Sequence, residues 1–381
     1  MKKIITIVGA RPQIIKSSAI SRAISTHFEN ELTEIIVHTG QHYDENMSSV
    51  FFNEMKIPQP NYNLNVGSGS HGKQTARMLE GLEEIFITEK PDAVLVYGDT
   101  NSTIAGALAA TKIFIPVVHV EAGLRSYNKA MPEEINRIAC DHMSTLLFTP
   151  TIFGIQNLKK EGFSSVTSKK ASANHPHIYH CGDIMYDNSL HFSSVSDQKS
   201  TFLEDHKLTS NDFILCTVHR DSNTDIKENL ESIFSALLAI AENSELKIVL
   251  PLHPRTKAKL KEQLNSELLE SIENSEFIQI IPPAGFIDII ALEKNARMII
   301  TDSGGLQKEA FFFEKPCLIL RPQTEWVEIV ENGNAVLTDA NYDRIIDGFN
   351  ELVLKTDFTY PNFYGDGKAA RFICQTIVDQ I

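Results

Sequence analysis

The chain has 381 residues, of which 42% are hydrophobic and 22% charged, and its formal net charge is −14 at pH 7. This length favours two domains, and the composition is typical of a soluble globular protein. The acidic balance argues against nucleic acid or an anionic membrane as a partner, so a site for a phosphorylated ligand has to be basic locally.

The first 150 residues alternate between apolar runs and helical patterns. We predict strands at 3–8, 34–38, 93–97, 116–120 and 145–148, with helices starting near residues 11, 46, 74, 102 and 132. Such alternation predicts a parallel sheet covered by helices on both faces. No stretch has 18 consecutive apolar residues, so we expect no membrane-spanning helix.

The alternation fails at 162–176, where Ser, Lys and Asn dominate, and this stretch reads as a linker or exposed loop. It resumes with strands near 214–218, 247–252, 279–281, 298–301 and 316–320, and a final helix occupies 363–381. We therefore predict an α/β protein with two Rossmann-like domains at 1–170 and 177–362.

Two classes of site find no support in the sequence. The five cysteines have no paired spacing, and we interpret them as reduced thiols of a cytoplasmic protein. Metal-binding residue types occur at His175, His177, His180 and Cys181, but their spacing matches no compact zinc pattern, so we predict no metal. The first glycine turn lacks G-x-G-x-x-G, so a nicotinamide dinucleotide is not expected.

The stretch 301–309 reads as a strand end followed by a helix, with a Ser-Gly-Gly turn between them. Gly304 and Gly305 let the backbone approach a ligand, and the helix start favours an anion such as a diphosphate. Ser303 can cap the helix or bind the ligand. Glu309 lies about one turn further on, where it could accept hydrogen bonds from ribose hydroxyls. The alternative is an ordinary strand-to-helix turn with a serine cap.

Polar residues also follow other predicted strands, at the sheet edge where open α/β folds bind ligands. These residues are Arg11, Gln41, Asp99, Glu121, His219 and Ser303. Six such positions from two domains suggest one site in the cleft between them.

Each group nevertheless has a simpler local explanation. Arg11 and Lys16 suit a diphosphate, but could be a solvated pair. Asp99, Glu121 and Glu133 would repel one another and raise at least one pKa, as a general base requires. Locally, Asp99 could cap its helix, Glu121 could pair with Arg125, and Glu133 could favour a helix dipole. His219 could hold a phosphate or shuttle a proton, or be structural.

In this order and spacing, the set of motifs resembles the non-hydrolysing UDP-N-acetylglucosamine 2-epimerases over almost the whole chain. The motifs that carry the resemblance are Gly9-Ala-Arg-Pro-Gln-Ile-Ile-Lys16, Thr39-Gly-Gln-His42, Tyr97-Gly-Asp-Thr100, His119-Val-Glu-Ala-Gly-Leu-Arg125, Pro132-Glu-Glu-Ile-Asn-Arg137, Thr217-Val-His-Arg220, Thr301-Asp-Ser-Gly-Gly305 and Glu309. The resemblance implies a glycosyltransferase-B-like fold: two Rossmann-like domains, a ligand cleft, and a last helix at 363–381 crossing back to the first domain.

The resemblance also implies roles for individual residues. It makes Asp99, Glu121, Glu133 and His219 catalytic. It assigns substrate binding to Arg11, Lys16, Arg137, Phe286, Ser303, Gly304, Gly305 and Glu309, with Phe286 near the uracil. A possible second, regulatory UDP-sugar site would involve Gln41, His42, Gln74 and His253. We expect a homodimer that needs no cofactor or metal.

The implied chemistry is elimination of UDP across C1–C2 to a 2-acetamidoglucal, followed by re-addition of UDP with the proton on the other face. The chain departs from the commonest motifs of the family at Gln13 and in the run 323–328. At both places it resembles the branch of the family that acts on UDP-2,3-diacetamido-2,3-dideoxy-glucuronate. We predict that both departures lie near the cleft. Rival readings are a hydrolysing relative that releases ManNAc and UDP, a glycosyltransferase of the same fold, and a non-catalytic nucleotide-sugar sensor.

Overall fold

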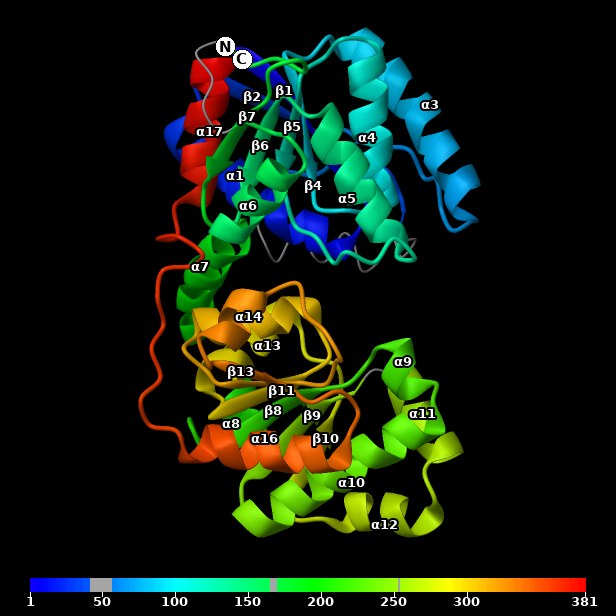
Figure 1. Ribbon diagram of the computed structural model, residues 1–381, viewed down its shortest axis with the longest axis vertical. Coiled ribbons are helices and arrows are strands. Elements are labelled where there is room, and N and C mark those ends of the chain that lie inside the picture. Colours follow the sequence, from blue (N-terminus) through cyan, green and yellow to red (C-terminus); the bar gives the residue numbers. More distant parts are fainter. Residues whose placement is uncertain (42–56, 165–169, 253) are drawn as a thin grey trace. The chain divides into compact units, whose positions relative to one another are not determined.

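The computed structural model describes residues 1–41, 57–164, 170–252 and 254–381. The chain divides into unit 1, Met1–Asn188 with Asn362–Ile381, and unit 2, Ser189–Pro361 (Figure 1). The division falls within α7 (Ile184–Lys199), later than the sequence suggested, because the unpredicted strand β7 (His177–His180) joins the sheet of unit 1. The helix predicted to start near residue 46 lies outside the described residues.

Unit 1 is built on a parallel sheet whose described strands follow the order β3-β2-β1-β4-β5-β6-β7. The strands are β1 (Lys2–Val8), β2 (Leu32–His38), β3 (Tyr62–Asn63), β4 (Ala93–Tyr97), β5 (Val117–Val120), β6 (Leu146–Thr149) and β7. The helices are α1 (Arg11–His27), α3 (His71–Glu89), α4 (Asn101–Lys112), α5 (Pro132–Met143), α6 (Ile152–Lys160) and α17 (Ala369–Gln380).

Alternating strand residues of unit 1 fill two cores, one on each face of the sheet. Ile4 and Leu95 pack with α1 and α17 on one face, whereas Ile5 and Val94 pack with α3 and α4 on the other (Figure 1). Strands buried on both faces are typical of parallel sheets, and they explain the continuous apolar runs in the sequence.

Unit 2 repeats this architecture with the described strand order β10-β9-β8-β11-β12-β13. Its strands are β8 (Phe213–Thr217), β9 (Lys247–Pro251), β10 (Ile278–Ile281), β11 (Met298–Thr301), β12 (Cys317–Ile319) and β13 (Ala335–Leu337). Its helices are α8 (Phe202–Asp205), α9 (Asp221–Thr224), α10 (Lys227–Ser244), α11 (Pro254–Gln263), α12 (Ser266–Asn274), α13 (Phe286–Asn295), α14 (Gly304–Phe312), α15 (Val327–Glu331) and α16 (Tyr342–Leu354).

Each sheet therefore reverses its strand order once, between β1 and β4 in unit 1 and between β8 and β11 in unit 2. In open parallel sheets this switch point leaves a crevice beyond the carboxyl ends of the strands, where ligands bind. A ligand site is consequently expected at the residues that follow β1, β4, β8 and β11. The prediction of two Rossmann-like units is confirmed.

Candidate functional site

The turn after β1 is held by a buried amide. The Gln13 Oε1 atom accepts hydrogen bonds from the N–H groups of Gly9 and Ala10 at 2.9 and 3.2 Å, and its Nε2 atom donates to the Tyr97 carbonyl at 3.0 Å. A side chain at Gly9 would collide with Ser102. Gln13 is only 2% exposed, so this departure shapes the turn at the switch point of unit 1 from within.

Lys16 and Glu121 form an ion pair in which the side chains are only 12% and 10% exposed. Both lie beside Gly98, since a Cβ atom there would be 3.2 Å from the Glu121 Oε2 atom and 3.5 Å from the Lys16 Nζ atom. Arg11 is exposed at the start of α1. The cation and the carboxylate thus meet at the switch point of unit 1.

Glu121 has φ +72°, a left-handed conformation that is uncommon for a residue with a side chain. Such strained residues concentrate at functional sites. The alternative pairing of Glu121 with Arg125 is wrong, because Arg125 instead binds Asp141 at 2.8 Å and Glu161 at 2.6 Å.

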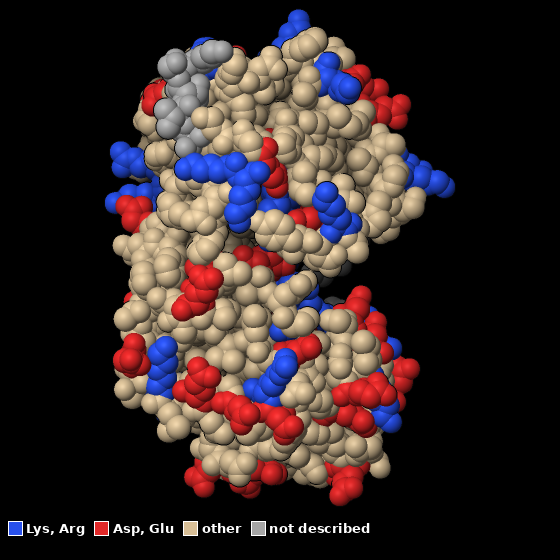
Figure 2. All heavy atoms as spheres, viewed as in Figure 1, with Lys and Arg blue, Asp and Glu red and all other residues tan. Residues whose placement is uncertain are grey.

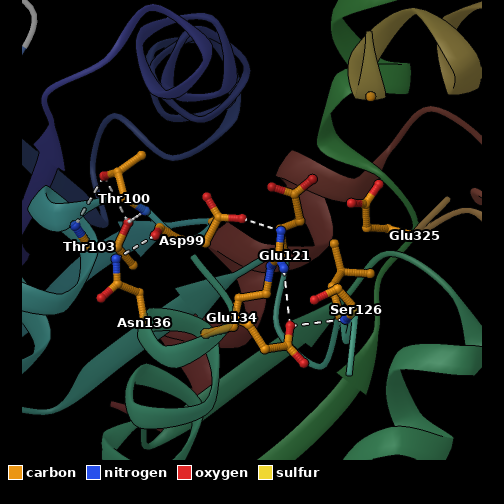
Figure 3. Close-up of polar contacts among 12 residues, drawn as sticks. Asp99, Thr100, Thr103, Glu121, Ser126, Glu134, Asn136 and Glu325 are labelled. Carbon is orange, nitrogen blue, oxygen red and sulfur yellow. Dashed lines mark hydrogen bonds and ion pairs between the residues drawn. The ribbon is translucent and has the colours of Figure 1, made fainter. Parts of the chain in front are cut away.

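Asp99, at the end of β4, forms an ion pair with Arg137 of α5. Arg137 also lies 3.2 Å from Glu134, whose carboxylate accepts from the N–H groups of Ser126 and Tyr127 (Figure 3). Asn136 donates to the Asp99 carbonyl at 2.8 Å. Asp99 does not cap α4, because the cap is Thr100.

The Asp99 carboxylate is 27% exposed, and its pKa is raised. Burial is the main cause, and the nearby Glu121 adds to it, whereas Arg137 opposes the shift. Glu133 contributes a smaller repulsion, and its own side chain is exposed in the first turn of α5. A raised pKa brings a carboxylate closer to the range that suits a general base.

In unit 2, the buried Asp302 organises the switch point between β8 and β11. Its carboxylate accepts from the N–H groups of His219 and Arg220 at 3.0 and 2.9 Å, and from the Asn223 amide at 3.1 Å. The His219 Nδ1 atom lies 3.0 Å from it, while the His219 side chain remains 54% exposed. Burial alone would raise the pKa of Asp302, but His219 and these donors hold it below its usual value.

The Ser-Gly-Gly turn opens α14, with Ser303 as its N-cap accepting from the Leu306 N–H. Unit 2 carries much of the acidic surface in the face drawn in Figure 2, and both signs of charge meet at this turn. A Cβ atom at Gly304 would be 3.6 Å from Arg321 and 4.0 Å from both Arg220 and Glu325, and Glu325 pairs with Arg321 at 2.9 Å. The Glu309 Oε2 atom lies 3.7 Å from the corresponding position at Gly305.

Trp326 belongs to the run 323–328, the second departure from the family pattern, and its side chain packs behind this turn. Its side-chain nitrogen donates to the Gly304 carbonyl at 2.9 Å, and it is 5% exposed. Phe286 is likewise 5% exposed, and its ring packs edge-on against Phe192. Both rings therefore support the backbone of unit 2 from within.

The residues expected at a second UDP-sugar site are only partly described. Gln41 accepts from the Ser102 hydroxyl at 2.7 Å, and Gln74 donates to the Gln41 carbonyl at 3.4 Å. These two side chains lie together in unit 1, whereas His42 and His253 lie outside the described residues. Within the described ranges, no group of three His, Cys, Asp or Glu residues could hold a metal, and no helix could span a membrane.

The model of one protein family, UDP-N-acetylglucosamine 2-epimerase, matches residues 25–378. The chain belongs to this family. The fold of family members is glycosyltransferase-B-like, and the chain is accordingly an enzyme of the isomerase class. The family match includes β4, β8 and β11 and the residues that follow them, whereas β1 and the start of α1 lie before it.

Three relatives of this epimerase show how far the similarity extends. A "UDP-N-acetylglucosamine 2-epimerase homolog" of Methanococcus maripaludis is 48% identical, covering 98% of this chain and 99% of the relative. The UDP-2,3-diacetamido-2,3-dideoxy-D-glucuronate 2-epimerase of Pseudomonas aeruginosa is 47% identical, covering 98% of each. A crystal structure of the Methanocaldococcus jannaschii UDP-GlcNAc 2-epimerase with UDP-GlcNAc and UDP has a TM-score of 0.84 at 40% identity, covering 99% of each chain.

Four residues hold the epimerase sites together in roles that the sequence did not predict: Gln13, which stood out only as a departure from the family pattern, and His119, Asp141 and Asp302. Each is buried and hydrogen-bonded. The available signal was a polar residue inside an apolar run, such as His119 in the strand Val-Val-His-Val. Such a residue needs a partner, but the sequence does not say which one.

Proposed function

We propose that this protein inverts C2 of a UDP-2-acetamido sugar, and that its substrate is UDP-2,3-diacetamido-2,3-dideoxy-glucuronate (UDP-GlcNAc3NAcA), a precursor for surface polysaccharide. The observation that carries the proposal is the set of carboxylates at the switch point of unit 1, accompanied by Lys16 and Arg137. A protein that only bound a diphosphate would gain nothing from negative charge there, so the carboxylates favour an enzyme over a sensor.

The proposed reaction has two steps. A carboxylate among Asp99, Glu121 and Glu133 removes the C2 proton while the bond between C1 and the UDP oxygen breaks, leaving 2-acetamidoglucal and UDP. The UDP oxygen then adds back to C1, and a proton is delivered to the opposite face of C2. Nothing is oxidised, so the reaction needs no nicotinamide cofactor.

The leaving diphosphate requires positive charge and N–H donors. In unit 2 the proposal gives this role to His219, Ser303, Gly304 and Gly305, supported by the proximity of Arg220 and Arg321 to the turn. In unit 1 it gives the same role to Arg11 and Lys16. Glu309 would bind the ribose, and Phe286 would lie near the uracil through its backbone because its ring is buried.

The choice of sugar rests on the relatives and on the departing motifs. The 47% identical Pseudomonas aeruginosa protein is named for the diacetamido-glucuronate, and the 48% identical Methanococcus maripaludis protein is named as a homolog of UDP-N-acetylglucosamine 2-epimerase. Because these identities are nearly equal, the departing motifs decide the proposal. A homodimer and a cytoplasmic location are part of the proposal, and the five free thiols agree with the location.

Product analysis with each purified UDP-sugar tests the function. The proposal predicts an epimeric UDP-sugar as the product. The value of kcat/KM should be about a hundredfold or more higher for the diacetamido-glucuronate than for UDP-GlcNAc. The reason is that a cation of the protein that pairs with the sugar carboxylate is left buried and unpaired when the neutral sugar binds. Equal or better activity on UDP-GlcNAc would overturn the branch but keep the epimerase. Free sugar plus UDP would indicate hydrolysis, and a glycosylated acceptor would indicate a transferase.

A further inference from the structure

His119 is a fully buried polar side chain in the middle of the unit 1 sheet. It belongs to β5, where it lies opposite Val96 of β4 and Leu147 of β6, and its exposed fraction is 0%. It follows no strand end, and the proposed reaction does not use it. A buried imidazole at this position therefore requires its own explanation.

Both ring nitrogens of His119 face acceptors. The Nδ1 atom is 2.7 Å from the Asp141 carboxylate, and the Nε2 atom is 2.8 Å from the Gly98 carbonyl. A carbonyl only accepts, so Nε2 must carry a proton. Asp141 also accepts from the Gly123 N–H at 3.1 Å and pairs with Arg125 at 2.8 Å, so it is ionised, and Nδ1 must carry a proton as well. The ring is an imidazolium.

The surrounding charges permit this cation in a buried place. Asp141 lies between His119 and Arg125, and Glu161 binds the other side of Arg125 at 2.6 Å. Burial alone would lower the pKa of His119, but the neighbouring Cys140 and Asp141 raise it well above its usual value. Two cations and two carboxylates thus alternate along one network.

This network contacts both turns that carry the proposed catalytic carboxylates. The Gly98 carbonyl, held by His119, immediately precedes Asp99, and the Gly123 N–H, held by Asp141, lies two residues after Glu121. Gly98 has φ +61°, and its N–H donates to the Val120 carbonyl at 3.0 Å. The ends of β4 and β5 are therefore joined by this backbone hydrogen bond and by the side chain of His119.

We infer that His119 is a constantly protonated positioning residue that, through Gly98 and Asp141, fixes Asp99 and Glu121 relative to each other. It does not exchange a proton during the reaction. The inference deepens the proposed function and rests on it, because the geometry it preserves matters only if these two carboxylates act on one sugar. The protonation and the rigidity of the turns can be measured without any activity.

The protonation is tested by nitrogen-15 NMR of the full-length protein labelled at histidine, with His119→Asn identifying the resonances. At pH 8.5, about two units above the ordinary pKa of histidine, both His119 nitrogens should give imidazolium shifts with attached protons. One nitrogen without a proton would overturn the inference.

The positioning role is tested with a matched pair of variants. The amide nitrogen of His119→Gln takes roughly the place of Nε2 and keeps a donor for Gly98, whereas that of His119→Asn takes the place of Nδ1 and keeps only Asp141. We expect kcat of His119→Asn to fall about 10- to 100-fold with KM within about threefold, since small misplacements of reacting groups act on kcat. His119→Gln should retain clearly more activity, and the exposed His27→Gln should match the wild type.

Hydrogen exchange followed by mass spectrometry supplies a readout independent of turnover. Peptides spanning 97–101 should exchange faster in His119→Asn, which loses the Gly98 contact, whereas peptides spanning 120–125 should exchange faster in His119→Gln, which loses Asp141. The same kcat and the same exchange in the two variants would overturn the positioning role. A wild type with no epimerase activity on any UDP-sugar would instead refute the proposed function, and exchange and NMR would still decide whether His119 is charged and holds the turns.

Discussion

Among the individual residues, Asp99 and Glu121 differ in how their charge is held. Glu121 is paired with Lys16 and sits in strained backbone, whereas Asp99 has a raised pKa in spite of Arg137. Environments that separate two carboxylates in this way suit one group to proton transfer and the other to staying ionised. Two experiments at the residue scale follow from this difference.

Removing the charge of each carboxylate should abolish turnover without abolishing nucleotide binding. We expect Asp99→Asn, Glu121→Gln and Glu133→Gln each to lower kcat by about a hundredfold or more. The Kd for UDP should change little in Asp99→Asn and Glu133→Gln, whereas Glu121→Gln also removes the ion-pair partner of Lys16. Steady-state kinetics and calorimetric titration with UDP measure the two quantities. Near-normal rates in all three variants would remove the carboxylates from the mechanism.

Arg137 should set the acid limit of activity. It opposes the rise in the pKa of Asp99, so Arg137→Met should raise that pKa further. A base must be deprotonated to act, and the acid limb of the kcat–pH profile should therefore move to higher pH. Lys112→Met, which removes a cation at the end of α4, is the control. A limb that stays in place, or moves to lower pH, would show that Asp99 is not the titrating base.

At the scale of elements, the sequence predicted where the site-bearing strands end, but it did not predict which buried residues hold the turns after them. The apolar runs located β1, β4, β5, β8 and β11 because these strands are buried on both faces, and the polar residue after each run therefore stood out. The strand β7 was missed because His177 and His180 interrupt its apolar pattern at the sheet edge. The supporting roles of Gln13 and Asp302 were not predicted because some of their hydrogen-bond partners come from distant segments.

The start of α17 depends on Asp187 of α7. Its carboxylate accepts from the N–H groups of Ala369 and Ala370 at 3.1 and 2.8 Å. Burial raises its pKa to about 6 from 3.8, although these two hydrogen bonds oppose the shift. The folded state thus binds this proton more tightly than the unfolded state, and the resulting stabilisation is full below about pH 4 and is lost as the pH rises through about 6.

Comparison with Asp187→Asn isolates this contribution, because the amide does not titrate. The free energy of unfolding of the wild type minus that of Asp187→Asn should fall between pH 4 and pH 7 by up to about 3 kcal/mol. Urea unfolding of unit 1, followed by circular dichroism at both pH values, measures it. A difference that grows with pH would contradict the raised pKa.

At the scale of the whole molecule, unit 1 is completed by the last segment of the chain. Ile373 and Ile377 of α17 are fully buried in the core that also contains Ile20 of α1. A charge at this place has no partner among the described core residues, and burying it costs several kcal/mol. Truncation or polar substitution at the C-terminus should therefore unfold the N-terminal sheet.

The single tryptophan makes this testable, because Trp326 belongs to unit 2. Ile377→Asp should lower the free energy of opening of unit 1 by about 3 kcal/mol or more. The β1 and β4 peptides should therefore lose their protection against hydrogen exchange under milder conditions than in the wild type. Tryptophan fluorescence should still report a folded unit 2 under conditions where unit 1 has opened. Ile135→Asp, at an exposed apolar position of α5, is the control. Unchanged protection of β1 in Ile377→Asp would contradict the role of α17.

The central claim is that the epimerase breaks and remakes the bond between C1 and UDP through a 2-acetamidoglucal. The most direct measurement is the NMR spectrum of the diacetamido-glucuronate product formed in heavy water. The account predicts the C2 epimer with deuterium at C2, because the proton removed by the carboxylate is replaced from solvent before re-addition is complete. An epimer that keeps its original C2 proton, or no epimer at all, would contradict it.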